Sequence, residues 1–101
     1  MTERRTARSG PDGVLTREFE VRNQYGIHAR PAALLVKTAS GFRAEITIEK
    51  AGLSVSAKSI MGLLTMEGHQ GAVLRVTARG EDAERALDAL GELFEKKFYE
   101  D

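Results

Sequence analysis

The apolar residues of this chain alternate between two spacings, and this switching is the feature that most limits its possible folds. Over residues 15–22, apolar and polar residues alternate, which is typical of a strand that buries one face. Over residues 29–41, apolar residues recur at the spacing of an amphipathic helix. The later segments repeat these patterns, with alternation in 43–50, 53–57 and 72–79 and helical spacing in 81–98. The chain therefore predicts interleaved strands and helices.

A further short helix is predicted over residues 58–64, where Ser59 is a plausible N-cap. The predicted element order is then β-α-β-β-α-β-α. We expect an α/β (α+β) open-faced sandwich, in which two long helices cover one face of a four-stranded, mostly antiparallel sheet. A length of 101 residues supports one domain, which we place at residues 14–101.

Residues 1–13 are polar and end in the turn-rich sequence Gly10-Pro11-Asp12-Gly13. They carry too little apolar surface to offset the entropy of ordering, so we expect a flexible tail. The segment lacks the apolar stretch of a secretory signal. The acidic start of the last helix, at Glu81, Asp82 and Glu84, is interpreted as helix capping.

The composition favours local recognition over a global electrostatic field. Lys plus Arg and Asp plus Glu number 15 each, so neither nucleic acid nor an anionic membrane is expected as the main partner. The chain has no cysteine, which excludes disulfides and thiolate metal sites and is consistent with a reducing interior. No apolar run approaches a membrane span. We expect a cytoplasmic protein.

The stretch around His28 carries the chemistry. Pro31 is tolerated only in the first turn of a helix, so the helix must begin within a residue or two of His28. Unpaired N–H groups at that helix start favour an anion, and Arg30 adds a planar fork suited to phosphate oxygens. This arrangement is typical of a phosphohistidine site. The alternative is an ordinary loop histidine beside a solvated arginine, and for an isolated His-x-Arg-Pro that alternative is preferred.

Two motifs, GIHARPAA at residues 26–33 and KSIMGLL at 58–64, resemble those of the HPr phosphocarriers of the bacterial phosphoenolpyruvate:sugar phosphotransferase system. The resemblance runs from about Leu15 to the C-terminus. It implies the same fold and a phosphoryl group carried on Nδ1 of His28, received from enzyme I and passed to a IIA domain. It also implies that Arg30 balances the phosphoryl charge and that N–H groups near Ala29 and Arg30 hold its oxygens. No metal or cofactor is required, and the chain is expected to be a carrier rather than a stand-alone catalyst.

The second motif implies regulatory phosphorylation of Ser59, for which HPr kinase/phosphorylase is a possible partner. A seven-residue helix cannot bury every side, so we expect Ile60, Met61 and Leu64 to offer an exposed docking surface, with a place in the core as the alternative. Tyr25 departs from the resemblance, because the family often has a small or polar residue there. A monomer is expected.

Two other functions fit parts of the sequence. A regulatory interaction module, controlled by phosphorylation at His28 or Ser59 without feeding sugar uptake, uses the same residues. A small RNA-binding domain would need aromatic and basic residues on the open sheet face. That face is predicted to carry Glu18, Glu20, Thr47, Glu49, Ser54 and Ser56 instead. His69 is interpreted as a solvated loop residue, because no spacing around it favours a metal site.

Overall fold

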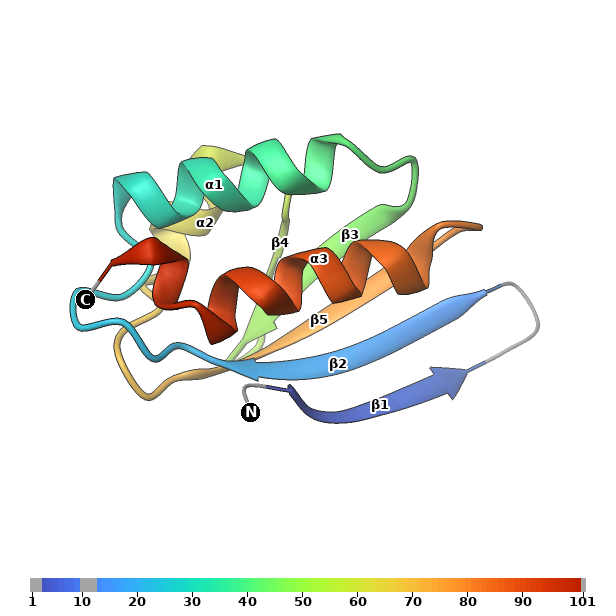
Figure 1. The fold of residues 1–101 in the computed structure, drawn as a ribbon, viewed down its shortest axis with the longest axis horizontal. Coiled ribbons are helices and arrows are strands. Elements are labelled where there is room, and N and C mark those ends of the chain that lie inside the picture. Colours follow the sequence, from blue (N-terminus) through green and yellow to red (C-terminus); the bar gives the residue numbers. More distant parts are fainter. Residues whose placement is uncertain (1–2, 10–12, 101) are drawn as a thin grey trace.

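The computed structural model describes residues 3–9 and 13–100. Within these ranges, five strands form one antiparallel sheet in the order β1-β2-β5-β3-β4, shown in Figure 1. The strands are β1 (Glu3–Ser9), β2 (Val14–Glu20), β3 (Glu45–Lys50), β4 (Leu53–Ser56) and β5 (Val73–Arg79). The predicted four strands are confirmed as β2 to β5, with ends that differ by up to two residues from those predicted.

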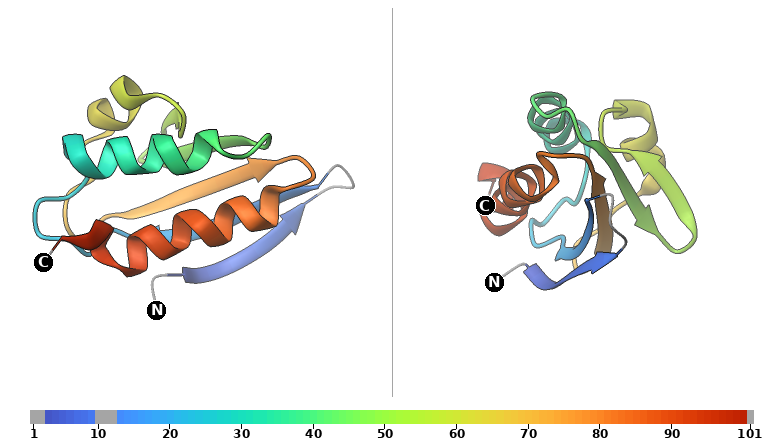
Figure 2. Two further views of the ribbon diagram at one scale, coloured as in Figure 1. Left: turned by 45° about the horizontal axis from the view of Figure 1, so that its top comes forward. Right: turned by 90° about the vertical axis from the view of Figure 1, so that its right-hand side faces the viewer.

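The helices lie on one face of the sheet, as predicted. They are α1 (Ala29–Ser40), α2 (Ile60–Met66) and α3 (Ala83–Glu95), followed by the short turn η1 (Lys97–Tyr99). Figure 2 shows α1 and α3 side by side over the sheet, and α2 packs against α1 and β4. From β2 onward the order is β-α-β-β-α-β-α, so the predicted open-faced sandwich is confirmed. In the part of the chain that the structure describes, no helix is long and apolar enough to cross a membrane.

Instead of the expected flexible tail, the structure has an edge strand at Glu3–Ser9. Strand β1 pairs antiparallel with β2, with Ser9 opposite Val14 and Ala7 opposite Thr16. The polar composition that predicted a tail does not oppose this pairing, because the ladder is made by backbone groups and edge strands are commonly charged. Residues 1, 2 and 10–12, on which the rest of that prediction falls, lie outside the described residues.

Aromatic stacking joins the sheet to the last helix. Phe19 on β2 and Phe94 on α3 are fully buried, and their rings stack with centroids 5.1 Å apart. Gly91 makes this possible, because a Cβ at that position would lie 2.8 Å from Cε1 of Phe19. The core around them draws on both layers and includes Leu35, Ile46, Ile48, Leu74, Val76, Leu87 and Leu90.

The last helix ends earlier than predicted. Helical spacing favoured a helix to Phe98, but α3 stops at Glu95 and Lys97, Phe98 and Tyr99 take φ values of 54°, 54° and 60°. Phe98 is still fully buried, with its ring edge-on to Phe94 at 5.0 Å. The spacing therefore predicted which side chain is buried but not the left-handed backbone that brings it there. This turn leads to Glu100, whose carboxylate contacts His28 at the start of α1.

Asp82 does not cap α3 as expected; it joins two segments instead. Its carboxylate accepts hydrogen bonds from the backbone N–H groups of Arg43, at 2.8 Å, and Ala44, at 2.9 Å. It makes no side-chain cap bond within α3. The Arg43 N–H is the main cause of a lowered pKa for the Asp82 carboxyl, opposed by partial desolvation and supported by the Ala44 N–H. Asp82 thus fastens the segment that precedes β3 to the start of α3.

We expect Asp82→Asn to lower the midpoint of thermal unfolding at neutral pH by more than Glu84→Gln, because Glu84 is exposed in the first turn of α3 and acts only through the helix dipole. Because the folded pKa of Asp82 is lowered, its contribution is present above the ordinary value of 3.8 and is lost as pH falls through the folded value. The difference from wild type should therefore shrink in strong acid. Thermal unfolding followed by circular dichroism over a pH series measures this, and a difference independent of pH would contradict it.

Candidate functional site

His28 is the N-cap of α1. Its backbone is extended, with φ −92° and ψ −164°, and its ring makes no capping bond. The helix begins at Ala29, and Ala32 N–H donates to the His28 carbonyl at 2.9 Å. Backbone N–H groups in a first helical turn have no partner within the helix, and Pro31 has no N–H to offer. The predicted placement of His28 at the helix entrance is confirmed.

A glycine contact fixes the loop that precedes His28. Gly26 has φ +68°, and a Cβ there would lie 2.3 Å from the Gly68 carbonyl oxygen. The same oxygen accepts a 2.7 Å hydrogen bond from Ile27 N–H. The loop after β2 is therefore held directly against the segment between α2 and β5. This close approach leaves no room for a side chain at position 26.

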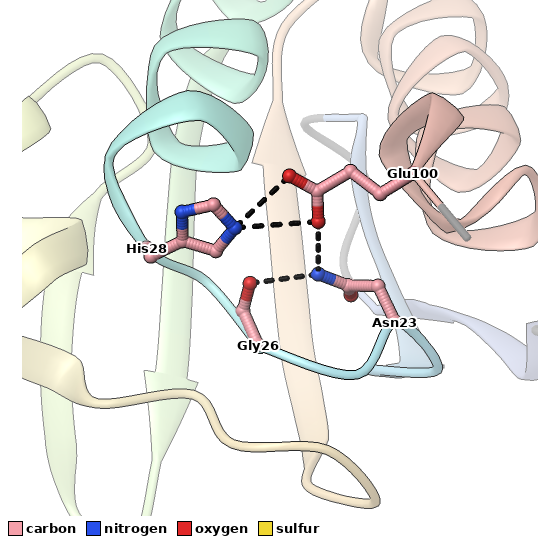
Figure 3. A network of polar contacts seen from close by, with 4 residues as sticks. All are labelled: Asn23, Gly26, His28 and Glu100. Atoms are coloured by element: carbon pink, nitrogen blue, oxygen red, sulfur yellow. Dashed lines mark hydrogen bonds and ion pairs between the residues drawn. The ribbon is translucent and has the colours of Figure 1, made fainter.

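The His28 ring belongs to a polar network with the C-terminal segment, shown in Figure 3. Its Nε2 lies 2.9 Å from Oε2 and 3.3 Å from Oε1 of Glu100. Asn23, fully buried, donates from Nδ2 to Glu100 Oε1 at 3.1 Å and to the Gly26 carbonyl at 2.7 Å. The His28 side chain remains 42% exposed, against 17% for Glu100. The ring is thus held from the Nε2 side and open to a partner.

Sequence reasoning missed Asn23 and Glu100 as site residues. Glu100 lies 72 positions after His28 and follows the left-handed turn, which no periodicity predicts. Asn23 gives little indication in the sequence that it is a site residue, because it lies in a predicted loop and asparagine is common in loops. Only the three-dimensional arrangement brings both to the imidazole.

Arg30 and Tyr25 flank the same surface. Both side chains are exposed, and together with Gln24 and Glu100 they line a hollow of about 300 Å³. The Tyr25 ring stands edge-on to the His28 ring, with centroids 6.3 Å apart and planes at 87°. Tyr25, the residue that departs from the family pattern, therefore forms one wall of the site.

The second motif forms α2 as predicted. Ser59 is its N-cap, and its Oγ accepts a 3.0 Å hydrogen bond from Gly62 N–H. Leu63 and Met66 are buried. The three expected docking residues are exposed on the remaining surface of the helix: Ile60 at 42%, Met61 at 74% and Leu64 at 37%. Their placement in the core, the alternative to docking, does not occur.

The other candidate features give no second site. His69 is exposed in the loop before β5, and its loop borders His28 in a shallow hollow. Among the residues that the structure describes, no group of three or more His, Asp or Glu side chains is placed to hold a metal ion. On the open sheet face, Glu18 and Arg75 face each other at 3.9 Å and Thr16 contacts Thr77 at 3.1 Å. None of the described residues on this face is aromatic, so the face lacks the stacking platform of an RNA-binding sheet.

Comparison with known proteins agrees with this geometry. Residues 15–96 match the family model described as "PTS HPr component phosphorylation site". The phosphocarrier protein HPr of Xylella fastidiosa is 47% identical over 88 residues, which cover 87% of this chain and 99% of that protein. The multiphosphoryl transfer protein of Salmonella typhimurium is 44% identical over 84 residues, covering 80% of this chain and 22% of that protein.

A solved structure gives the same result for the fold. The crystal structure of HPr-C-His from Thermoanaerobacter tengcongensis superposes with a TM-score of 0.82 at 46% identity, covering 85% of this chain and 97% of that one. The matched region includes the His28 loop, α2 and the sheet from β2 onward. The chain belongs to the HPr family of phosphocarriers of the phosphoenolpyruvate:sugar phosphotransferase system.

Proposed function

We propose that His28 receives a phosphoryl group on Nδ1 from enzyme I and passes it to a IIA domain. The observation that carries this proposal is the half-exposed His28 ring at the N-cap of α1, held through Nε2 so that Nδ1 is on the side of the ring away from Glu100, as Figure 3 shows. Membership in the HPr family supports the reaction class.

Each part of the site has a role in this proposal. The Nδ1 lone pair is the nucleophile. Phosphoryl oxygens are held by the N–H groups of Ala29 and Arg30, which point out of the first turn of α1, where the helix dipole also favours negative charge. The exposed Arg30 guanidinium balances the remaining charge. The proposal requires no metal ion or bound cofactor on this chain.

The surface beside His28 suits brief binding of a donor and then an acceptor. Ile60, Met61 and Leu64 form an exposed apolar surface on α2, which packs beside α1. We propose that enzyme I and the IIA domain dock on this surface in turn, and that the chain acts as a cytoplasmic monomer. Small interfaces of this kind allow the fast dissociation that a carrier needs.

The direct test is incubation of the full chain with enzyme I and phosphoenolpyruvate, followed by mass analysis of the intact protein. The expected product carries one acid-labile phosphoryl group. Addition of a IIA domain should then remove the group from this chain and label the acceptor. A labelled chain that donates to no IIA domain would instead favour the regulatory module. An unlabelled chain would contradict the carrier and would leave only a regulatory module controlled through Ser59.

Arg30 should contribute through the geometry of its guanidinium as well as its charge. We expect Arg30→Ala to slow phosphoryl acceptance, because the charge that balances the phosphoryl group is lost. The loss should be about tenfold and no more, because an exposed charge contributes less than a buried one. Arg30→Lys should fall between alanine and wild type, since lysine supplies charge without the planar fork. Rapid-quench measurement of phosphoryl transfer from enzyme I compares the three. Equal rates would remove Arg30 from the mechanism.

We also propose that phosphorylation of Ser59, by a kinase such as HPr kinase/phosphorylase, inhibits transfer to His28. Phosphoserine at this N-cap adds roughly −1.5 to −2 charge. The N–H groups of the first turn of α2 can donate hydrogen bonds to the phosphate, so the helix should stay folded. The new charge stands beside Ile60, whose side chain belongs to the proposed docking surface. Inhibition therefore arises from a weaker encounter with enzyme I.

Ser59→Asp should reproduce part of this inhibition. We expect the KM for the carrier in enzyme I-dependent phosphorylation to rise about fivefold, with kcat nearly unchanged, because the charge affects docking and not the His28 ring. Ser59→Ala is the matched control for loss of the hydroxyl cap. Steady-state kinetics over a range of carrier concentrations separates the two constants. A fall in kcat at constant KM would place the effect at His28 instead.

A further inference from the structure

The contact between Glu100 and His28 has a specific consequence for the imidazole. An ionised carboxylate can only accept hydrogen bonds, so an Nε2 atom 2.9 Å from Oε2 and 3.3 Å from Oε1 must carry the hydrogen. A neutral imidazole has one N–H, and Nδ1 is then left with a free lone pair. Nδ1 is the atom that the proposed phosphoryl transfer uses.

We propose that Glu100 is a positioning residue for phosphoryl acceptance, and that its carboxylate fixes both the orientation of the His28 ring and the nitrogen that attacks. This inference rests on the proposed function of His28. Carboxylates fix the orientation and tautomer of metal-bound histidines in the same way. We call the set Asn23, His28 and Glu100 the carboxylate clasp.

Glu100 is itself held in place. Asn23 is fully buried and uses its Nδ2 group for both Glu100 Oε1, at 3.1 Å, and the Gly26 carbonyl, at 2.7 Å. The Glu100 backbone N–H donates to the Lys97 carbonyl at 2.9 Å. A carboxylate fixed by side-chain and backbone contacts loses little freedom when it binds the ring, as a positioning residue requires.

The backbone that leads to Glu100 is strained, and the end of a helix does not by itself require this strain. Three consecutive residues, Lys97, Phe98 and Tyr99, have φ values of 54°, 54° and 60°, a region unfavourable for residues with a Cβ. Burial of Phe98 against Phe94 stabilises the turn. Strain of this kind is concentrated at functional sites, and here its result is the delivery of Glu100 to His28.

The carboxylate clasp is compatible with the bonds and electron pairs that change in the transfer step. The Nδ1 lone pair of His28 forms the new N–P bond. At the same time the P–N bond of the donor, a phosphorylated histidine, breaks, and the electron pair of that broken bond returns to the donor nitrogen. The hydrogen on Nε2 stays in place before and after the step. As the ring donates its lone pair it gains positive character, and the adjacent Glu100 carboxylate stabilises that charge.

The test compares wild type with Glu100→Ala, Glu100→Gln and the matched control Glu95→Gln, which changes an exposed glutamate at the end of α3. Two-bond ¹H–¹⁵N correlation spectra of the neutral ring report the protonation and hydrogen bonding of each nitrogen, independently of any partner. Initial rates of phosphorylation by charged enzyme I report the effect on transfer. Thermal unfolding checks that all variants are folded.

We expect Glu100→Ala to shift the Nε2 signal away from that of a hydrogen-bonded N–H and to lower kcat about tenfold, the scale typical of outer positioning carboxylates. Glu100→Gln should fall between, and Glu95→Gln should match wild type in both measurements. Unchanged ring signals, or a folded Glu100→Ala variant phosphorylated at the wild-type rate or faster, would overturn the proposal. If wild type is not phosphorylated at all, the proposed function fails, and the ring spectra still decide whether the clasp holds the imidazole.

Discussion

His28→Ala is expected to abolish enzyme I-dependent phosphorylation of this chain while leaving its fold intact. The ring is the proposed nucleophile, and it stands at the N-cap of α1, where the phosphoryl group is to be held. Removal of a side chain that is 42% exposed creates no core cavity, so we expect the free energy of unfolding to change by only about 1 kcal/mol or less. Intact mass after incubation with enzyme I and phosphoenolpyruvate measures the loss.

The sequence offers a matched control for this variant, because His69 is the only other histidine. It is exposed in the loop before β5, and His69→Ala should be phosphorylated like wild type. Labelling retained in His28→Ala and lost in His69→Ala would move the site to the other histidine. Loss in both variants would point to a role for the loops in docking rather than to one nucleophile.

Gly26→Ala is expected to destabilise the protein by about 2–4 kcal/mol, a large value for a single substitution. Two effects add: a φ of +68° is unfavourable for alanine, and the new Cβ would stand 2.3 Å from the Gly68 carbonyl oxygen. Relief requires the His28 loop to move away from the segment before β5, which also breaks the Ile27 N–H bond to Gly68. Urea unfolding with linear extrapolation measures the change.

Gly52→Ala separates these two effects. Gly52 has φ +85°, but a Cβ there would meet no heavy atom within 4 Å, so only the backbone cost of about 1–2 kcal/mol remains. A clearly larger loss for Gly26→Ala would show that the close approach of the two segments is rigid. If both variants lose the same free energy of unfolding, the segment around Gly68 can move aside at no cost and does not fix the loop.

The sequence predicted those parts of the fold that depend on side-chain periodicity. Phe19, Leu35 and Leu90 lie in the core because their spacing matches the strand or helix that carries them. Ser59 and Pro31 marked helix starts through their local chemistry, and His28 was placed from Pro31 by the same reasoning. The half of the site that belongs to one short stretch was therefore predictable.

The other half depends on tertiary contacts that leave no local pattern. Glu100 reaches His28 only because Phe98 is buried through a left-handed turn, and the spacing of Phe98 is equally consistent with a longer helix. Asp82 resembled a helix cap in the sequence, but its partners are the N–H groups of Arg43 and Ala44. Strand β1 forms through backbone pairing with β2, which composition does not report.

The most direct test of this account is to locate the phosphorus atom on the ring. The full chain, labelled with ¹⁵N, is phosphorylated by enzyme I and phosphoenolpyruvate and studied by ³¹P–¹⁵N correlation NMR at alkaline pH, where phosphohistidine persists. We predict one phosphorus, coupled to Nδ1 of His28, with the hydrogen retained on Nε2 beside Glu100. Phosphorus on Nε2 of His28, on His69, or on no histidine would contradict the central claim.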